Sequence, residues 1–227
     1  MSISERLYIR WLPDEASEPT STLVLTAPNK QFVDIRLIKP SSPSEPYTTL
    51  DWGIGGRSVG TPGHGEWIHD IDSRTEEPEA DAGDTFPHPT LPDVSLERGR
   101  MRHPESGEIR EYEEAWKHID IDPDPADGLH EGKRVSVFLE MDDEGAEGGR
   151  RRGMISRVGQ FCQGIVRDGK DVSVQRWAWT DGEDWSKVAQ IGDATMACEA
   201  TWKEHLKEGD QVRHDGFTWT VKSVKVW

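Results

Sequence analysis

The feature that most constrains the fold is an alternation of apolar and polar residues with a period of two, which recurs from end to end of the chain. Side chains of a β-strand point alternately to its two faces, so this pattern predicts strands. The runs are rich in β-branched and aromatic residues, as strands usually are. They are RLYIRWL, STLVLTA, FVDIRLI, GEWIHDI, DVSLERGRM, EIREYEEAW, RVSVFLEM, GMISRVGQFCQGIV, DVSVQRWAWT and FTWTVKSVKVW.

Short polar turns separate several of these runs. HPESGE (103–108), RDGK (167–170) and RHDGF (213–217) each contain an Asp-Gly or Ser-Gly step that tolerates the positive φ of a tight hairpin. Only residues 194–209 have the pattern of a helix, with Gly209 as its stop. The sequence therefore predicts a mainly antiparallel, all-β protein with at most one or two short helices, built as a barrel or a sandwich.

A segment rich in Pro, Asp and Gly near mid-chain indicates a boundary between two domains. Each half carries a similar series of strand, glycine-containing hairpin and Trp-bearing strand, which favours two small related barrels. We predict one barrel at 1–119, a linker at 120–132 and a second barrel at 133–227. Two further segments, 41–49 and the acidic, proline-rich 73–93, are predicted to be mobile loops.

Charge limits the partners of the chain. It has 27 basic and 43 acidic residues, a net charge of -16, which disfavours binding to nucleic acid or to an anionic membrane. It lacks a run of about 20 apolar residues, and its N-terminal segment has no apolar region of signal-peptide length. Two isolated cysteines suit a reducing compartment. We expect a soluble intracellular protein, either a monomer or a homodimer.

The stretch LDWGIGGRSVGTPGHGEWIHDID (50–72) resembles a ligand site at first sight. It fits neither of the two glycine-rich phosphate-binding templates, and no helix pattern follows it. His64, His69, Asp70 and Asp72 are possible metal ligands, but alternation along a strand separates His69 from Asp70. We interpret the stretch as two strands joined by an exposed turn, with Gly53, Gly55 and Gly56 allowing a sharp bend as a barrel closes and Trp52 and Trp67 packing beside the turn.

A second metal candidate lies in the linker. Residues 120–131 place Asp at positions one, three and five and Glu at position twelve, as a calcium loop does. Pro125 stands where that loop needs Gly, and the flanking segments are predicted strands rather than helices. We therefore expect a solvated acidic linker and predict neither a metal site nor a cofactor.

The sequence lacks the common hydrolase and metalloprotease motifs, so we expect a protein that is not an enzyme. Glu111 and Glu113, or His118, could serve as acid and base inside a barrel. The ten tryptophans are more suggestive, because aromatic side chains either fill a small barrel or line a cavity for an apolar ligand. Trp116, Trp177, Trp179 and Trp219 are the candidates for lining such a cavity.

Four segments, TLDWGIGG, HPESGEIREYEEAWKHID, RVGQFCQGIV and LKEGDQVRHDGFTWTV, resemble in order and spacing the fungal Hri family, named for interaction with a casein kinase I. The resemblance implies tandem lipocalin-like (calycin-type) β-barrels, a cytoplasmic and nuclear location and a noncatalytic role. It brings no catalytic residues. The implied function is therefore interaction with a casein kinase I or a similar protein.

Casein kinase I prefers acidic residues before its target. Ser73 follows Asp70 and Asp72, and Thr85 follows a series of acidic residues, so both are candidate phosphorylation sites. Two alternatives to the interaction function stay open. One is a carrier of a small apolar ligand in a Trp-lined barrel, and the other is a lipocalin-like isomerase or cyclase.

Overall fold

The computed structural model describes residues 1–125, 128–144, 150–180 and 183–227, and in these ranges the strands are paired antiparallel. The helical structure within them is a 3₁₀ turn, η1 (Ala197–Glu199), followed by the short helix α1 (Ala200–Lys203). This confirms the predicted all-β, mainly antiparallel class. Among the described helices, none has the length and apolar character that crossing a membrane would require.

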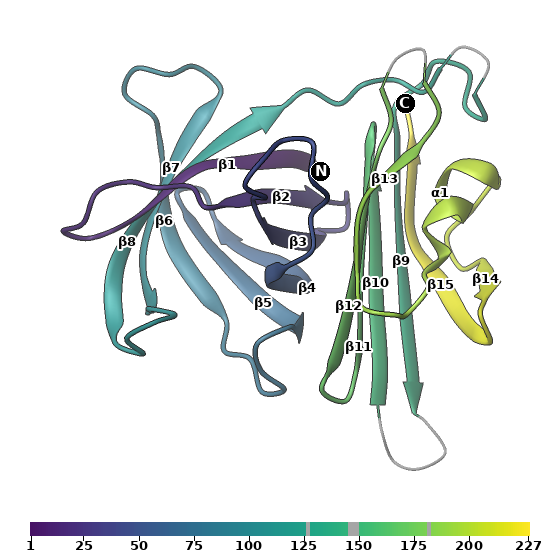
Figure 1. Ribbon diagram of the computed structural model, residues 1–227. Coiled ribbons are helices and arrows are strands. Elements are labelled where there is room, and N and C mark those ends of the chain that lie inside the picture. The colour runs from purple at the N-terminus through teal and green to yellow at the C-terminus, as the bar shows by residue number, and fades with distance from the viewer. Residues whose placement is uncertain (126–127, 145–149, 181–182) are drawn as a thin grey trace.

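The first half of the chain forms a closed barrel of eight strands in sequence order, drawn in purple to teal in Figure 1. Each strand pairs with the next one, and β1 pairs with β8 to close the barrel. The strands are β1 (Ser2–Trp11), β2 (Thr20–Thr26), β3 (Gln31–Ile38), β4 (Leu50–Thr61), β5 (His64–Asp72), β6 (Asp81–Pro87), β7 (Val94–Arg102) and β8 (Ile109–Ile119).

The second half forms a seven-stranded sheet in the order β13-β12-β11-β10-β9-β15-β14, where a second closed barrel was predicted. Its edge strands, β13 and β14, are not paired with each other in the described part of the chain. The strands are β9 (Val135–Glu144), β10 (Arg150–Val158), β11 (Phe161–Asp168), β12 (Asp171–Ala178), β13 (Ser186–Ile191), β14 (Gln211–His214) and β15 (Phe217–Val226).

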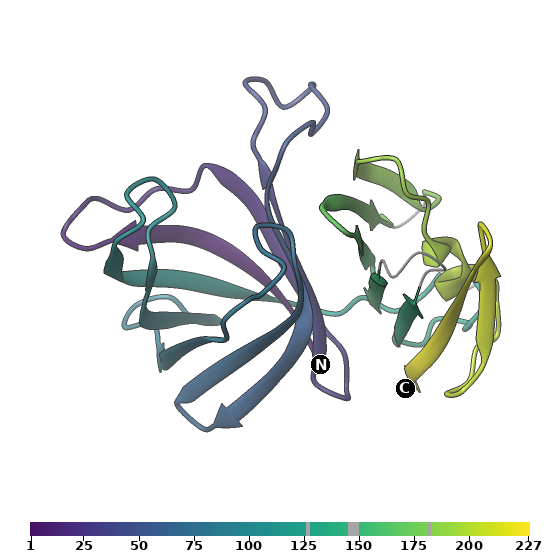
Figure 2. The same ribbon diagram turned by 90° about the horizontal axis from the view of Figure 1, so that it is seen from below.

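The second sheet does not need to close because both of its faces are covered. On one face, Leu139, Ile155 and Trp219 pack against the η1–α1 segment. On the other face, Phe138 and Met154 pack against Val33, Ile35 and Leu37 on the outside of the barrel, among others. Figures 1 and 2 both show the sheet beside the barrel, with the connecting chain passing from one to the other. Burial of both faces removes the drive for the sheet to curl round and close on itself.

The glycine-rich stretch forms β4 and β5 joined by a turn, as predicted, but two of its glycines act differently from our interpretation. A Cβ on Gly53 would lie 3.0 Å from Ile165 Cδ1, and one on Gly55 would lie 2.8 Å from Met154 Sδ. These positions are glycine because the second sheet approaches the barrel wall closely. Gly56 does lie beside a β-bulge, where the β4–β5 register shifts, so a bend is present there.

Three local predictions were wrong. GMISRVGQFCQGIV is two strands, β10 and β11, separated at Gly159, whose φ of 52° reverses the chain. Segment 73–93 contains β6, which pairs with both β5 and β7. The helix predicted over 194–209 is limited to η1 and the four residues of α1. The strands β13 and β14 were not predicted, because with six and four residues both are too short to carry a clear alternating run of their own.

Candidate functional site

The barrel encloses a cavity of about 360 Å³, which is within the range of about 300–1,000 Å³ typical of ligand pockets. Side chains from all eight strands line it, because alternate residues of each strand point inward. The apolar part of the lining includes Phe32, Ile54, Trp67, Met101 and Trp116. The rest is polar, and much of it is charged.

An unusual alternation on β3 produces this charged interior. The apolar residues Val33, Ile35 and Leu37 point out of the barrel into the contact with the second sheet. Asp34 and Arg36 therefore share the opposite face and line the cavity. The second sheet thus provides the apolar environment that a barrel strand would otherwise find inside.

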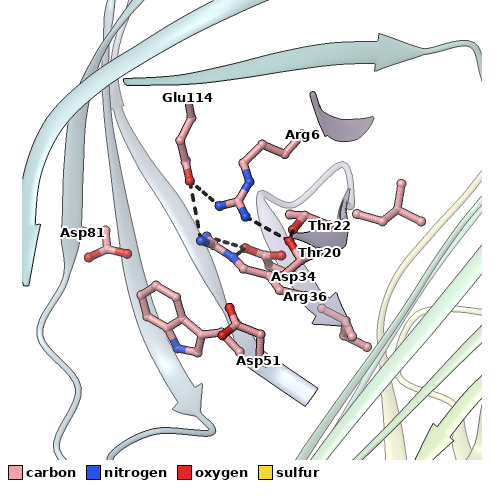
Figure 3. A network of polar contacts seen from close by, with 12 residues as sticks. Arg6, Thr20, Thr22, Asp34, Arg36, Asp51, Asp81 and Glu114 are labelled. Carbon is pink, nitrogen blue, oxygen red and sulfur yellow. Dashed lines mark hydrogen bonds and ion pairs between the residues drawn. The ribbon is translucent and has the colours of Figure 1, made fainter. Parts of the chain in front are cut away.

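Arg36, Asp34, Glu114 and Arg6 form a connected ionic network (Figure 3). Arg36 donates from Nε and Nη2 to Asp34 Oδ2, at 3.0 and 2.9 Å, and its Nη1 lies 3.6 Å from Glu114 Oε1. Arg6 donates from Nη1 to the same Glu114 oxygen at 2.5 Å and also contacts Glu18. Residues 6, 34, 36 and 114 are all less than 9% exposed, so the ionic contacts are little screened by water.

A further buried acidic residue, Glu97, lies on β7, which pairs with β8, the strand that carries Glu114 and Tyr112. The hydroxyl of Tyr112 donates to Glu97 Oε1 at 2.7 Å. Burial, and then the charge of Glu114, raise the pKa of Glu97 to about 8. Glu97 therefore carries a proton at neutral pH.

His69 contacts two carboxylates from inside the barrel wall. Its Nδ1 lies 2.9 Å from Asp72 Oδ2, and its Nε2 lies 3.3 Å from Asp81 Oδ2. Burial lowers the pKa of this imidazole, but the hydrogen bonds to Asp72 and Asp81 outweigh it and raise the pKa to about 9. We therefore treat His69 as an imidazolium at neutral pH, with a charge that the two carboxylates share.

Two buried polar atoms beside the cavity have no hydrogen-bond partner within the described ranges. They are Oδ1 of Asp34, an acceptor, and Nε1 of Trp116, a donor. Asp34 is 4% exposed and Trp116 is 9% exposed, and both residues line the cavity. Because an unpaired buried polar group costs roughly 1–3 kcal/mol, a molecule that satisfied these atoms would gain binding free energy.

A model of the family described as Protein HRI1 matches residues 2–223. The chain belongs to the HRI1 family. The chain is also similar to a solved structure, the crystal structure of the uncharacterized protein YLR301w from Saccharomyces cerevisiae, with 16% identity and a TM-score of 0.75. That similarity covers 99% of this chain and 98% of the other, and at this identity it shows a shared fold. No curated protein matches the chain.

In this HRI1-family chain the four candidate tryptophans lie in different places. Trp116 lines the barrel cavity. Trp219 is 1% exposed and fills the core of the second sheet. Trp177 packs against that core, with its ring centroid 5.3 Å from that of Trp202. Trp179 lies just beyond β12 and is half-buried. The structure therefore brings one of the four to the barrel cavity, where Trp67 joins it.

The structure also places the two candidate phosphorylation sites. Ser73 follows β5 and is half-buried, and its Oγ accepts a hydrogen bond from the backbone N–H of Gly53. Asp72, one of the acidic residues before it, is buried against His69. Thr85 lies in β6 rather than in a loop, and its side chain lines the barrel cavity.

The carboxylates suggested for acid–base chemistry lie mainly outside the barrel. Glu111 is exposed, and Glu113 contacts Arg10, Arg98 and Tyr8 on the outer face. Of the three suggested residues, His118 is the one that lines the cavity. Sequence reasoning missed the inward-facing carboxyl groups of Asp34, Glu97 and Glu114. The sequence held no clear signal for Asp34: FVDIRLI has charged residues on one face and three aliphatic residues on the other, which is the ordinary pattern of a strand with one solvent-facing side.

The suggested metal sites do not assemble in the described part of the chain, where no group of three or more His, Cys, Asp or Glu side chains could hold a metal ion. His64 contacts Asp84 at the exposed turn, and Asp70 lies 3.3 Å from Arg57 on the other face from His69. In the linker, Asp124 pairs with the buried Arg157. Positions 126 and 127 of the suggested calcium loop lie outside the described residues.

Proposed function

We propose that this protein is a noncatalytic binding protein that holds a small molecule with polar groups inside its first barrel. The single observation that carries the proposal is the pair of unpartnered atoms, Asp34 Oδ1 and Trp116 Nε1, beside a cavity of about 360 Å³. Buried polar groups in folded proteins are nearly always paired, so an acceptor and a donor left open at one cavity fit a ligand that supplies both partners.

The charged lining changes the expected chemistry of the ligand. A Trp-lined barrel alone favours an apolar ligand, and Trp67 and Trp116 do border this cavity. Asp34, Arg36 and Glu114 border it as well, and an apolar ligand would leave their remaining hydrogen-bonding capacity unmet. The ligand proposed here therefore combines an apolar body with polar groups.

Native mass spectrometry of protein purified from its own source tests this proposal. We expect an adduct of small-molecule mass on the wild-type chain. Val24 lines the cavity, so Val24→Trp should fill part of it and abolish the adduct. Val59, 41% exposed on β4, provides the control: Val59→Trp should keep the adduct. Wild-type protein without any adduct would contradict the proposal, as would an adduct that Val24→Trp retains.

We also propose the partner function that the family resemblance implies, an interaction with a casein kinase I. It is supported by three exposed glutamates, Glu76, Glu77 and Glu79, in the connection between β5 and β6. Clustered exposed carboxylates suit the basic pockets of such a kinase and would mainly accelerate association.

Binding of the purified kinase, followed by fluorescence anisotropy, tests this second proposal. Glu76→Gln, Glu77→Gln and Glu79→Gln combined should weaken binding at least tenfold, whereas Glu105→Gln with Glu108→Gln at the β7–β8 turn should not. Equal affinity for both variants would contradict the proposed docking segment. Incorporation of labelled phosphate tests Ser73 and Thr85 separately: loss of label in Ser73→Ala or Thr85→Ala identifies the acceptor, and an unlabelled wild-type chain removes both.

A further inference from the structure

The buried networks of the barrel interior hold more acidic than basic side chains, while two basic groups at more exposed positions, Lys30 and the N-terminal amine of Met1, also line the cavity. Three basic side chains face six acidic ones in the connected networks described above. The basic residues are Arg6, Arg36 and His69, and the acidic residues are Glu18, Asp34, Asp72, Asp81, Glu97 and Glu114. Even with a proton on Glu97, the carboxylates outnumber the basic groups by five to three. A buried site with excess negative charge is stabilised by an additional cation.

The geometry locates where that cation would be accepted. Asp34 uses Oδ2 for both hydrogen bonds from Arg36, which leaves Oδ1 without a donor among the described groups. Glu97 is the group that carries the excess charge as a bound proton, since it lies near Glu114 without an ion-pair partner of its own in the described structure. The site therefore lacks a donor at Asp34 and lacks a positive charge at Glu97.

We propose that the ligand of the first barrel is a small organic cation, whose ammonium group donates a hydrogen bond to Asp34 Oδ1 in the field of Glu97 and Glu114. Its apolar body lies against Trp67 and Trp116, and the ligand also offers an acceptor to Trp116 Nε1. This inference rests on the proposed binding function and names its ligand class. The aromatic rings favour a cation for a second reason, because the face of an indole attracts positive charge. The basic side chains Arg6 and Arg36 are already engaged by carboxylates, so they do not oppose such a ligand strongly.

Binding of a cation should be coupled to the proton on Glu97. The charged and titratable groups that face Glu97 are Tyr112 and Glu114 on β8, Asp81 on β6 and Arg36 on β3. A cation placed beside Glu97 lowers the pKa of this carboxyl group from about 8, so binding at pH 7 releases a proton. The affinity for the cation should therefore rise as the pH increases from 6 to 8.

Isothermal titration calorimetry with three matched probes tests the ligand class. The probes are phenethylamine, which is cationic, 2-phenylethanol, which is neutral, and 3-phenylpropanoate, which is anionic; all three have the same phenyl body. We expect phenethylamine to bind at least tenfold more tightly than the alcohol, and we expect no binding of the carboxylate. Repeating the titration at pH 7 in phosphate and in Tris buffer should show proton release of up to one equivalent.

Variants separate the site from general effects of charge. Asp34→Asn should weaken phenethylamine binding at least tenfold, and Glu97→Gln should abolish the proton release. Glu66→Gln changes an exposed glutamate on β5 and should alter neither. Circular dichroism checks that each variant is folded, and Val24→Trp, which fills the cavity without removing a charge, should abolish binding of phenethylamine independently.

Each other outcome overturns the cation inference in a way that distinguishes it from the binding function. Tighter binding of the alcohol or the carboxylate would leave a barrel-binding protein whose ligand is not a cation. Binding of phenethylamine that Asp34→Asn and Val24→Trp do not affect would place the amine outside the cavity. Absence of binding by all three probes would also overturn the inference, and the adduct seen by native mass spectrometry would then decide the binding function separately.

Discussion

The barrel and the second sheet place their apolar and charged side chains in opposite ways. In the second sheet the apolar residues of β9, β10 and β15 pack into a filled core, in which Trp219 is 1% exposed. In the barrel, β3 turns its aliphatic residues outward onto that sheet and its charged residues inward. The residues inside the barrel therefore do not have to form the apolar core, so the interior can hold a cavity lined by charged side chains. A domain that packs on the outside of a barrel can free its inside for binding.

The largest expected effect on stability comes from opening a cavity in the packed core of the second sheet. Trp219→Ala removes a large, fully buried side chain and should destabilise the protein by about 3–5 kcal/mol, because it leaves a cavity in a packed core. Urea unfolding followed by circular dichroism measures the change. Trp227→Ala, which removes a tryptophan that is 39% exposed, should cost less than about 1 kcal/mol. Similar losses for the two variants would show that the second sheet is not the packed region.

The next effect is a dependence of the free energy of unfolding on pH that arises from titratable groups inside the barrel. The pKa of Glu97 is raised to about 8 in the folded protein, so the native state binds more protons than the unfolded state above about pH 4.5. Stability should therefore fall as the pH rises from about 5 to 8, by at most about 1.4 kcal/mol per pH unit. His69, with a pKa of about 9, adds a fall of the same sign above about pH 6.5.

Glu97→Gln isolates the contribution of the carboxyl group. The variant should lose the fall in stability between pH 5 and 6.5, where His69 does not contribute, when urea unfolding is measured across this range. If the variant and the wild-type protein show the same pH profile, the carboxyl group of Glu97 is not held in its protonated form by the barrel interior.

A smaller effect concerns the contact between the two regions. Gly55→Ala places a Cβ 2.8 Å from Met154 Sδ and should cost about 1–3 kcal/mol through overpacking. Because the closest clash is with Met154, while Ile165 Cγ2 lies at 3.2 Å, adding Met154→Ala should recover part of this loss, and a double-mutant cycle in urea measures the coupling. Strictly additive losses would indicate that the barrel and the sheet do not approach each other closely at β4.

The last and smallest expected effect is the difference in stability loss between substitutions of two tryptophans of the barrel. Trp52 donates from Nε1 to Asp72 Oδ1 at 3.0 Å, so Trp52→Phe should cost about 1–3 kcal/mol by leaving a buried carboxylate short of a donor. Trp116→Phe removes an Nε1 group that has no partner in the described structure and should cost less than about 1 kcal/mol. Thermal unfolding of the pair compares them, and a larger loss for Trp116→Phe would mean that its Nε1 group is bonded in the unliganded protein.

The fold class could be predicted from the sequence because period-two alternation is a local signal that strands carry individually. The closure of the first barrel and the openness of the second sheet could not be predicted, since they depend on which faces meet. β6 was missed for a related reason: a strand such as DAGDTFP, which lines a polar cavity, needs no apolar face and looks like a loop. The turn at Gly159 was hidden inside a continuous apolar run.

The candidate site was less accessible to sequence reasoning. Trp116 was predicted to line a cavity on the grounds of residue type, and the structure places it there. Asp34, Glu97 and Glu114 were not, because each lies on a different strand and only the barrel brings them together. Their importance comes from burial and from one another, neither of which a linear pattern contains. The prediction of an apolar ligand rests on the number of tryptophans and stays a prediction; only the fold shows which carboxylates share the cavity with Trp67 and Trp116.

One measurement tests the contrast between the hollow barrel and the filled sheet most directly. In ¹H–¹⁵N NMR spectra the indole N–H groups of the tryptophans are resolved probes in both regions, and titration with phenethylamine compares them in one sample. We predict that the signals of Trp67 and Trp116 shift progressively, while that of Trp219 stays fixed. Shifts at Trp219, or at Trp177 and Trp202, with Trp67 and Trp116 unchanged would contradict the account.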